Sequence, residues 1–162
     1  MTCRTNPEEE YCLLCRQMES LLDGEEDWVS VTANAAALLY GALPDINWVG
    51  FYRVKGGELL LGPFEGKPAC VHIPLGKGVC GTAAFKGTVL LVPDVHRFSG
   101  HIACDSASAS ELAIPLRGKG KVIGVLDIDS PVRERFQRRD ADSLQKIADI
   151  VSAHCVRSME GT

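Results

Sequence analysis

Hydrophobic residues recur at helical spacing at both ends of the chain. The first such segment, residues 6–22, opens with Pro7 and three glutamates, which suit the first turn of a helix. A second segment, residues 27–43, is rich in alanine and leucine and ends before Pro44. A third, residues 138–159, alternates apolar and charged faces with the same period. The pattern predicts two N-terminal helices, about residues 7–43, and a C-terminal helix, about residues 138–159.

Between these helices the pattern shifts to short apolar or alternating runs bounded by glycine, which is typical of strands. The predicted strands cover residues 47–54, 58–64, 69–74, 89–92, 111–116 and 122–128, and a short helix covers 79–85. This order indicates an α+β fold with a central, mainly antiparallel sheet of about six strands, flanked by helices. At 162 residues the chain is expected to form a single domain, residues 1–162, with the sheet and a long loop in about 46–130.

Residues 93–110 form the long loop, and loops of this length in compact domains are usually functional. It contains Cys104 within HIACDSASASE, among small polar residues. A loop thiol is more accessible than a core thiol, and only an accessible thiolate reacts. The alternative is a small buried hydrophobe. His101 could lower the pKa of this thiol or be a solvated loop histidine.

Composition narrows the class of protein. The net charge is −4 with both signs interspersed, so no basic patch predicts binding to nucleic acid. The first residues are polar and acidic, and no apolar run is long enough to cross a membrane, so a cytoplasmic location is expected. Seven cysteines, an odd number, argue against a structural disulfide framework.

Other cysteines and glycines carry weaker signals. Cys70 is placed in the strand 69–74, on the same face as His72, and Cys80 near the start of the short helix, where backbone N–H groups favour a thiolate. Either could equally be an inert core thiol, and their spacing fits no zinc pattern. No role is predicted for Cys12 and Cys15, which form a CxxC pair in the first helix, or for Cys3 and Cys155 near the two ends of the chain. A weak GxGxxG match favours close backbone approach to a ligand or to the loop, at Gly76, Gly78 and Gly81.

Carboxylates provide a sharper signal. Asp127 and Asp129 alternate in GVLDIDS, so both leave one face of a strand end, and Glu111 on the preceding strand could reach that face. Three close carboxylates cannot all ionise cheaply, so one should stay protonated and act as an acid. The alternative is a solvated strand end or a helix cap. Trp48 and Tyr52 share a face of the first strand, where they either pack in the core or line a pocket for a thioether methyl.

Taken together, NWVGFY, LLLGPFEGKPACVHIPLGKGVCGTAA, LVPDVHRFSGHIACDSASASE and GVLDIDS resemble the free methionine-(R)-sulfoxide reductases, stand-alone GAF-domain enzymes. The resemblance implies an antiparallel sheet with helices on one side and a homodimer. It assigns Cys104 as nucleophile, Cys70 as principal resolving cysteine and Cys80 as an auxiliary one. It places three carboxylates around the sulfoxide oxygen and an aromatic residue at the substrate methyl, namely Glu111, Asp127, Asp129 and Trp48, with Tyr52 beside them. Ser99 departs from the proline expected there.

The activity that this resemblance implies is reduction of free methionine (R)-sulfoxide without metal or organic cofactor. The Cys104 thiolate would attack sulfur, become a sulfenic acid and condense with a second thiol to a disulfide. A dithiol such as thioredoxin would then reduce the disulfide. The alternative is a non-catalytic GAF module that binds a ligand or senses oxidants through Cys104. A sensor has no need of the carboxylate set, which therefore favours the enzyme.

Overall fold

The computed structural model describes residues 6–102 and 104–158, and it contains the four helices that the sequence predicts, α1 (Pro7–Leu22), α2 (Trp28–Ala42), α3 (Gly78–Lys86) and α4 (Arg138–Ser158). The first two begin at capping side chains. The Asn6 side chain accepts a hydrogen bond from the Glu8 backbone N–H at 3.2 Å, and Asp27 accepts one from Ser30 at 2.9 Å. These caps satisfy backbone donors that the first turn leaves free. Met159, which the sequence included in the last helix, lies outside the described residues, as does Cys3.

Six strands form one sheet, and every neighbouring pair is antiparallel. They are β1 (Trp48–Lys55), β2 (Glu58–Gly66), β3 (His72–Pro74), β4 (Leu90–Val92), β5 (Ser110–Gly118) and β6 (Lys121–Ser130), in the order β3-β2-β1-β6-β5-β4. The predicted α+β class and six-stranded antiparallel sheet are confirmed. The central strands β1 and β6 have a partner on both sides, so residues at their ends are held in fixed register.

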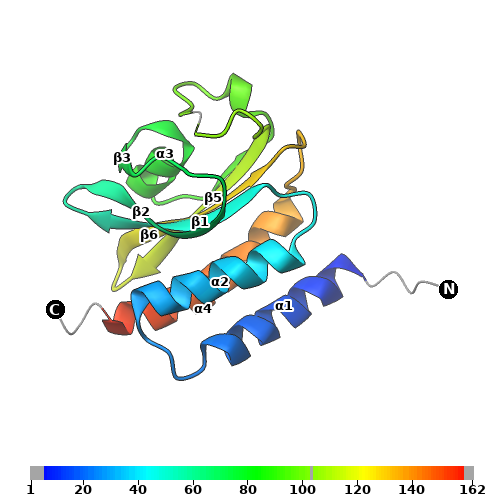
Figure 1. The fold of residues 1–162 in the computed structure, drawn as a ribbon, viewed down its shortest axis with the longest axis vertical. Coiled ribbons are helices and arrows are strands. Elements are labelled where there is room, and N and C mark those ends of the chain that lie inside the picture. Colours follow the sequence, from blue (N-terminus) through cyan, green and yellow to red (C-terminus); the bar gives the residue numbers. More distant parts are fainter. Residues whose placement is uncertain (1–5, 103, 159–162) are drawn as a thin grey trace.

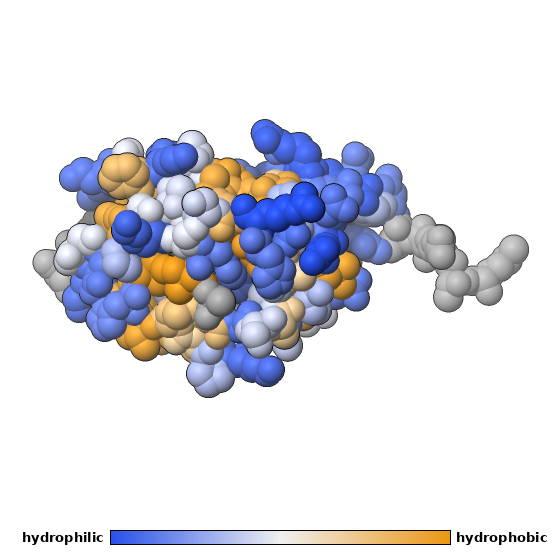
Figure 2. All heavy atoms as spheres, turned by 90° about the horizontal axis from the view of Figure 1, so that it is seen from above, coloured by the Kyte–Doolittle hydropathy of each residue, from blue (hydrophilic) through white to orange (hydrophobic). Residues whose placement is uncertain are grey.

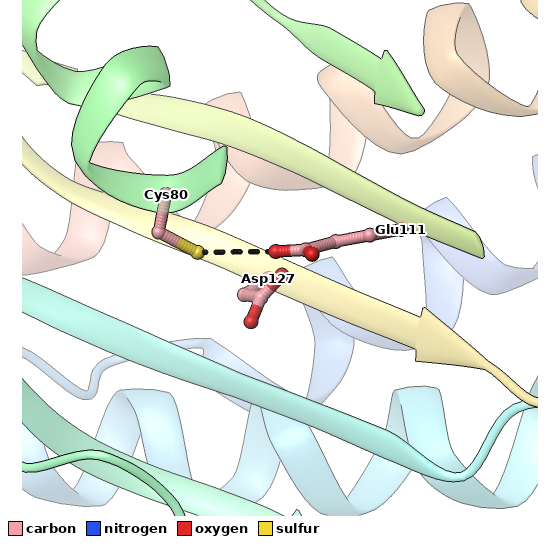
Figure 3. A group of neighbouring side chains, drawn as sticks. All are labelled: Cys80, Glu111 and Asp127. Atoms are coloured by element: carbon pink, nitrogen blue, oxygen red, sulfur yellow. Dashed lines mark hydrogen bonds between the residues drawn. The ribbon is translucent and has the colours of Figure 1, made fainter. Parts of the chain in front are cut away.

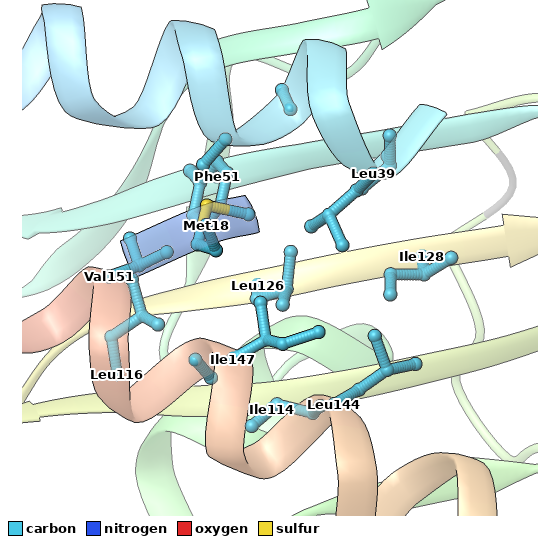
Figure 4. Close-up of a cluster of buried hydrophobic side chains, with 14 of the residues drawn as sticks. Met18, Leu39, Phe51, Ile114, Leu116, Leu126, Ile128, Leu144, Ile147 and Val151 are labelled. Carbon is cyan, nitrogen blue, oxygen red and sulfur yellow. The ribbon is translucent and has the colours of Figure 1, made fainter. Parts of the chain in front are cut away.

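The helices lie on both faces of the sheet, three on one side and α3 alone on the other (Figure 1). The expectation of helices on one side is therefore wrong for α3. The three-helix side buries the larger apolar cluster, in which side chains of α4 meet those of β5 and β6 (Figure 4). A smaller cluster lies between the sheet and α3. Because side chains alternate along a strand, each central strand contributes to both clusters.

Two local predictions are corrected. The strand expected at 69–74 is shorter, His72–Pro74, because the chain pairs with the edge of β2 only from His72 onward. Cys70 therefore lies in the connection before β3, not in a strand beside His72. The loop expected at 93–110 contains one turn of 3₁₀ helix, Val95–Arg97, which begins where the Asp94 side chain accepts a hydrogen bond from the His96 backbone N–H. None of the described helices is long and apolar enough to span a membrane.

Candidate active site

The three predicted carboxylates do converge, and the register of two strands brings them together. Glu111 on β5 pairs with Asp129 on β6, and Asp127 lies two residues earlier on β6. All three side chains leave the α3 side of the sheet and line one pocket. Glu111 and Asp127 are each only 6% exposed. The alternative of a solvated strand end is thus wrong for this pair.

Burial and mutual repulsion change the charge state of this carboxylate cluster. Loss of solvation and the neighbouring Asp129 raise the pKa of Glu111 to about 8. Burial, and then the charge of Glu111, raise the pKa of Asp127 well above its ordinary value. The pKa of Asp129 is raised in the same way, by burial and then by Asp127 and Asp105. The cluster therefore retains protons at neutral pH, as a general acid requires.

Cys80 lies beside the carboxylates, in the first turn of α3. Its Sγ donates a hydrogen bond to Glu111 Oε1 at 3.6 Å, and Figure 3 shows Asp127 next to this pair. Burial, followed by the charges of Asp127 and Glu111, raises the pKa of the thiol well above its ordinary value. Helix position alone would have favoured a thiolate at Cys80. The surrounding carboxylates outweigh it, so Cys80 is a neutral donor here. These three side chains also offer ligand atoms close enough together to hold a metal ion.

A disulfide joins Cys70 to Cys104, across 34 residues of sequence, with the two Cα atoms 5.8 Å apart. It links the connection before β3 to the long loop. Cys104 lies in an exposed stretch of that loop and lines the pocket, whereas Cys70 is not among the lining residues. The other described cysteines, Cys12, Cys15, Cys80 and Cys155, are not part of this disulfide. The loop position predicted for Cys104 is confirmed, and the alternative of a core cysteine is wrong.

Two aromatic side chains form another wall of the pocket, as the alternation along β1 predicted. Trp48 and Tyr52 stack with ring centroids 6.1 Å apart, and both line the pocket. The Trp48 indole N–H donates to the Lys67 carbonyl at 3.0 Å, and the Tyr52 hydroxyl donates to the Cys70 carbonyl at 3.0 Å. The hydrogen bond from Tyr52 holds the backbone of Cys70, one of the two cysteines of the disulfide. Tyr52 thus has a positioning contact that the sequence did not indicate.

Asn47, just before β1, is a residue that sequence reasoning missed. Its amide Nδ2 donates hydrogen bonds to Asp105 Oδ2 and to Ser108 Oγ, both at 3.2 Å. Its backbone N–H donates to the Asp129 carbonyl at 3.0 Å. Asn47 therefore ties the loop that carries Cys104 to the strand that carries two carboxylates. The partners lie 58 and 61 residues away along the chain, so no local pattern could have identified them.

The loop also lies against the start of α3 and against the carboxylates. A Cβ on Gly78 would lie 3.1 Å from the Ile102 side chain, and the backbone of Gly78 has φ +63°. Close approach of the loop is thus the reason for glycine here, as the bend suggested. His101 Nε2 lies 3.6 Å from Glu111 Oε2, and burial lowers the pKa of the imidazole. This favours neutral histidine beside Glu111 over an imidazolium that would activate Cys104.

The face of the molecule drawn in Figure 2 is mixed in hydropathy. Seen from above, hydrophobic patches alternate with hydrophilic side chains, without one continuous apolar face (Figure 2). The pocket itself combines aromatic side chains, acids and one sulfur of the disulfide. Such a lining suits a small polar molecule with an apolar end.

Comparison with known proteins gives a consistent result. The GAF domain model matches residues 8–154. A protein of Bacillus subtilis, YtsP, is 53% identical over 144 residues, 88% of each chain. The free methionine-R-sulfoxide reductase of Escherichia coli is 51% identical over 142 residues, 88% of this chain and 86% of the relative. The structure of free methionine-R-sulfoxide reductase from Neisseria meningitidis with its substrate superposes with TM-score 0.93 at 40% identity, covering 100% of this chain and 98% of that one.

Proposed function

Since the chain belongs to the GAF-domain family of free methionine-R-sulfoxide reductases, we propose that Cys104 reduces free methionine (R)-sulfoxide in the pocket between the sheet and α3. Cys70 is then the resolving cysteine. The observation that carries this assignment is the disulfide between these two cysteines, only one of which lines the pocket. The cysteine facing the substrate is the nucleophile, and its partner outside the lining closes the disulfide.

The cycle has three chemical steps. In the reduced enzyme, the Cys104 thiolate attacks the sulfoxide sulfur, the oxygen is transferred to Cys104, and methionine leaves. Cys104 is then a sulfenic acid, oxidised by two electrons. The Cys70 thiol condenses with it, which forms the disulfide and releases water. Cys80 is the auxiliary resolving thiol of this scheme, but its hydrogen bond to Glu111 and its burial favour Cys70 for the main route.

The carboxylate cluster supplies the proton that the sulfoxide oxygen needs as the S–O bond breaks. Glu111 is the best donor, because its raised pKa keeps it protonated at neutral pH. Asp127 and Asp129 hold the same oxygen and the substrate amine. Trp48 and Tyr52 contact the apolar end of the substrate. Restriction to the free amino acid follows from a pocket closed by the loop that carries Cys104.

Regeneration requires an external reductant. We assign this role to a thioredoxin-like dithiol, which would reduce the disulfide by exchange through the exposed loop at Cys104. A cytoplasmic location is part of this proposal, because thiol reductants keep that compartment reducing. Two relatives that are named free methionine-R-sulfoxide reductase support the proposed activity. We also propose that two of these single-domain chains form a homodimer.

The test is methionine release from the separate R and S epimers of free methionine sulfoxide, and from N-acetylated sulfoxide, with dithiothreitol as reductant. We expect turnover of the free R epimer alone, and none for Cys104→Ser, because an alcohol cannot replace a thiolate at neutral pH. Cys12→Ser, outside the pocket, is the matched control and should retain full activity. Substantial turnover by Cys104→Ser would contradict the assignment. A disulfide that forms with peroxide but never with sulfoxide would instead indicate a redox sensor.

A further inference from the structure

Three side chains at the floor of the pocket already have the spacing of a metal site. Cys80 from α3, Glu111 from β5 and Asp127 from β6 each offer one ligand atom, and these atoms all lie within 4.8 Å of one another (Figure 3). Zinc binds thiolate sulfur at about 2.3 Å and carboxylate oxygen at about 2.0–2.2 Å in tetrahedral sites, so sulfur and oxygen ligands lie roughly 3.5 Å apart. Cys80 Sγ and Glu111 Oε1 are 3.6 Å apart. Little movement of this pair is needed.

A second observation comes from Asp127. Its Oδ1 is fully buried and has no hydrogen-bond partner among the described residues. A buried acceptor without a partner is costly unless something binds it. The three side chains also line the pocket, so an ion can reach them from solvent. A water molecule from the pocket would complete the coordination, as in zinc sites with three protein ligands.

We propose that Cys80, Glu111 and Asp127 bind a zinc ion that occupies the catalytic pocket and inhibits the enzyme. One thiolate with two carboxylates suits zinc, whereas magnesium and calcium prefer oxygen ligands alone. Binding exchanges the protons of Cys80 and of the carboxyl groups for the ion and involves no change of oxidation state. Because Cys80 is not part of the Cys70–Cys104 disulfide, the site is complete in the oxidised enzyme.

Cobalt(II) is the probe for binding, because a thiolate ligand gives it a charge-transfer absorption. The oxidised enzyme is titrated in a Cys12→Ser/Cys15→Ser background, which removes the accessible thiol pair of α1. We expect a saturable absorption band that one equivalent of zinc abolishes. Cys80→Ser should lose the band, and Asp127→Asn should weaken zinc binding at least about tenfold while keeping a thiolate signal. Absence of a band, or its persistence in Cys80→Ser, would overturn the site.

Inhibition is measured separately and rests on the proposed function. Prereduced enzyme, freed of dithiothreitol, is mixed with methionine sulfoxide and zinc, and the methionine formed in one turnover is counted. We expect inhibition that substrate relieves, and Asp127→Asn should need at least about tenfold more zinc for the same fractional inhibition. Zinc that binds without inhibiting would overturn the inhibitory role. An enzyme that forms no methionine even without zinc would contradict the proposed function, while the cobalt band would still decide the site.

Discussion

At the residue scale, we propose different roles for the two bonded cysteines, and a single turnover would separate them. Cys70→Ser retains Cys104, so it should form about one methionine per enzyme and then stop with thioredoxin as reductant. The sulfenic acid would form but lack its resolving partner. Rapid-quench methionine counting and a sulfenic-acid reagent measure both products. Cys12→Ser should turn over normally. If Cys80→Ser stops after one turnover and Cys70→Ser does not, the two resolving roles are reversed.

We expect Glu111 to set the pH dependence of the first step. Its pKa of about 8 means that the proton is present below pH 8 and lost above it, so the methionine-forming rate should fall as pH rises through about 8. Glu111→Gln should lower this rate at least about tenfold below pH 8 and abolish the alkaline fall. Asp129→Asn should also lower the rate but keep the fall. Rapid quench at several pH values tests this, with iodoacetamide labelling to follow Cys104. Unchanged rates in both variants would make the carboxylates structural.

The same residue links stability to pH. The folded protein binds a proton at Glu111 up to about pH 8, whereas an unfolded glutamate loses it near pH 4.3. Between these values the folded state holds more protons, so the free energy of unfolding should fall as pH rises, by up to about 1.4 kcal/mol per unit for this group. Glu111→Gln removes this contribution. Urea unfolding at pH 5 and pH 8 should therefore show a smaller loss in the variant than in the unmodified protein, and an equal loss would refute the linkage.

At the scale of elements, Asn47 couples the start of β1 to the loop of Cys104. Asn47→Ala removes two hydrogen bonds to Asp105 and Ser108, each worth about 1 kcal/mol, so we expect a loss in kcat/KM of up to about thirtyfold. Ser108→Ala removes one bond and should lose less. Limited proteolysis within the loop should accelerate in parallel. A loss of activity with unchanged proteolysis would mean that Asn47 acts on the substrate and not on the loop.

The elements themselves were largely predictable from the sequence. Alternation on β6 placed Asp127 and Asp129 on one face, because a strand has a period of two residues whatever surrounds it. The extent of β3 was not predictable, because it depends on where the chain meets the edge of β2 and on the disulfide at Cys70. The contact between Cys80 and Glu111 joins residues 31 positions apart, so only the packing of α3 on the sheet reveals it.

At the scale of the whole molecule, we expect the Cys70–Cys104 disulfide to contribute to stability as well as to the proposed chemistry. It closes a segment of 34 residues, and the loop-entropy model gives about 3–4 kcal/mol for that length. Reduction should therefore lower the free energy of unfolding by up to this amount. Denaturation of the oxidised and the dithiothreitol-reduced protein measures the difference. Cys70→Ser should have the same free energy of unfolding with and without reductant. If reductant lowers its stability as much as it lowers that of the unmodified protein, the effect does not come from this disulfide.

The two faces of the sheet have unequal consequences for evolution. On β6, Leu126 and Ile128 face the three-helix core, while Asp127 and Asp129 between and after them face the pocket. We expect a substitution at a core-facing position to alter how much folded protein a cell retains, and a substitution at the next, pocket-facing position to alter catalysis. Selection for abundance and selection for chemistry thus act on alternate codons of one short stretch of gene. A saturation library of β6 should show this as an alternation. Substitutions at core-facing positions should lower expression, and substitutions at pocket-facing positions should lower activity.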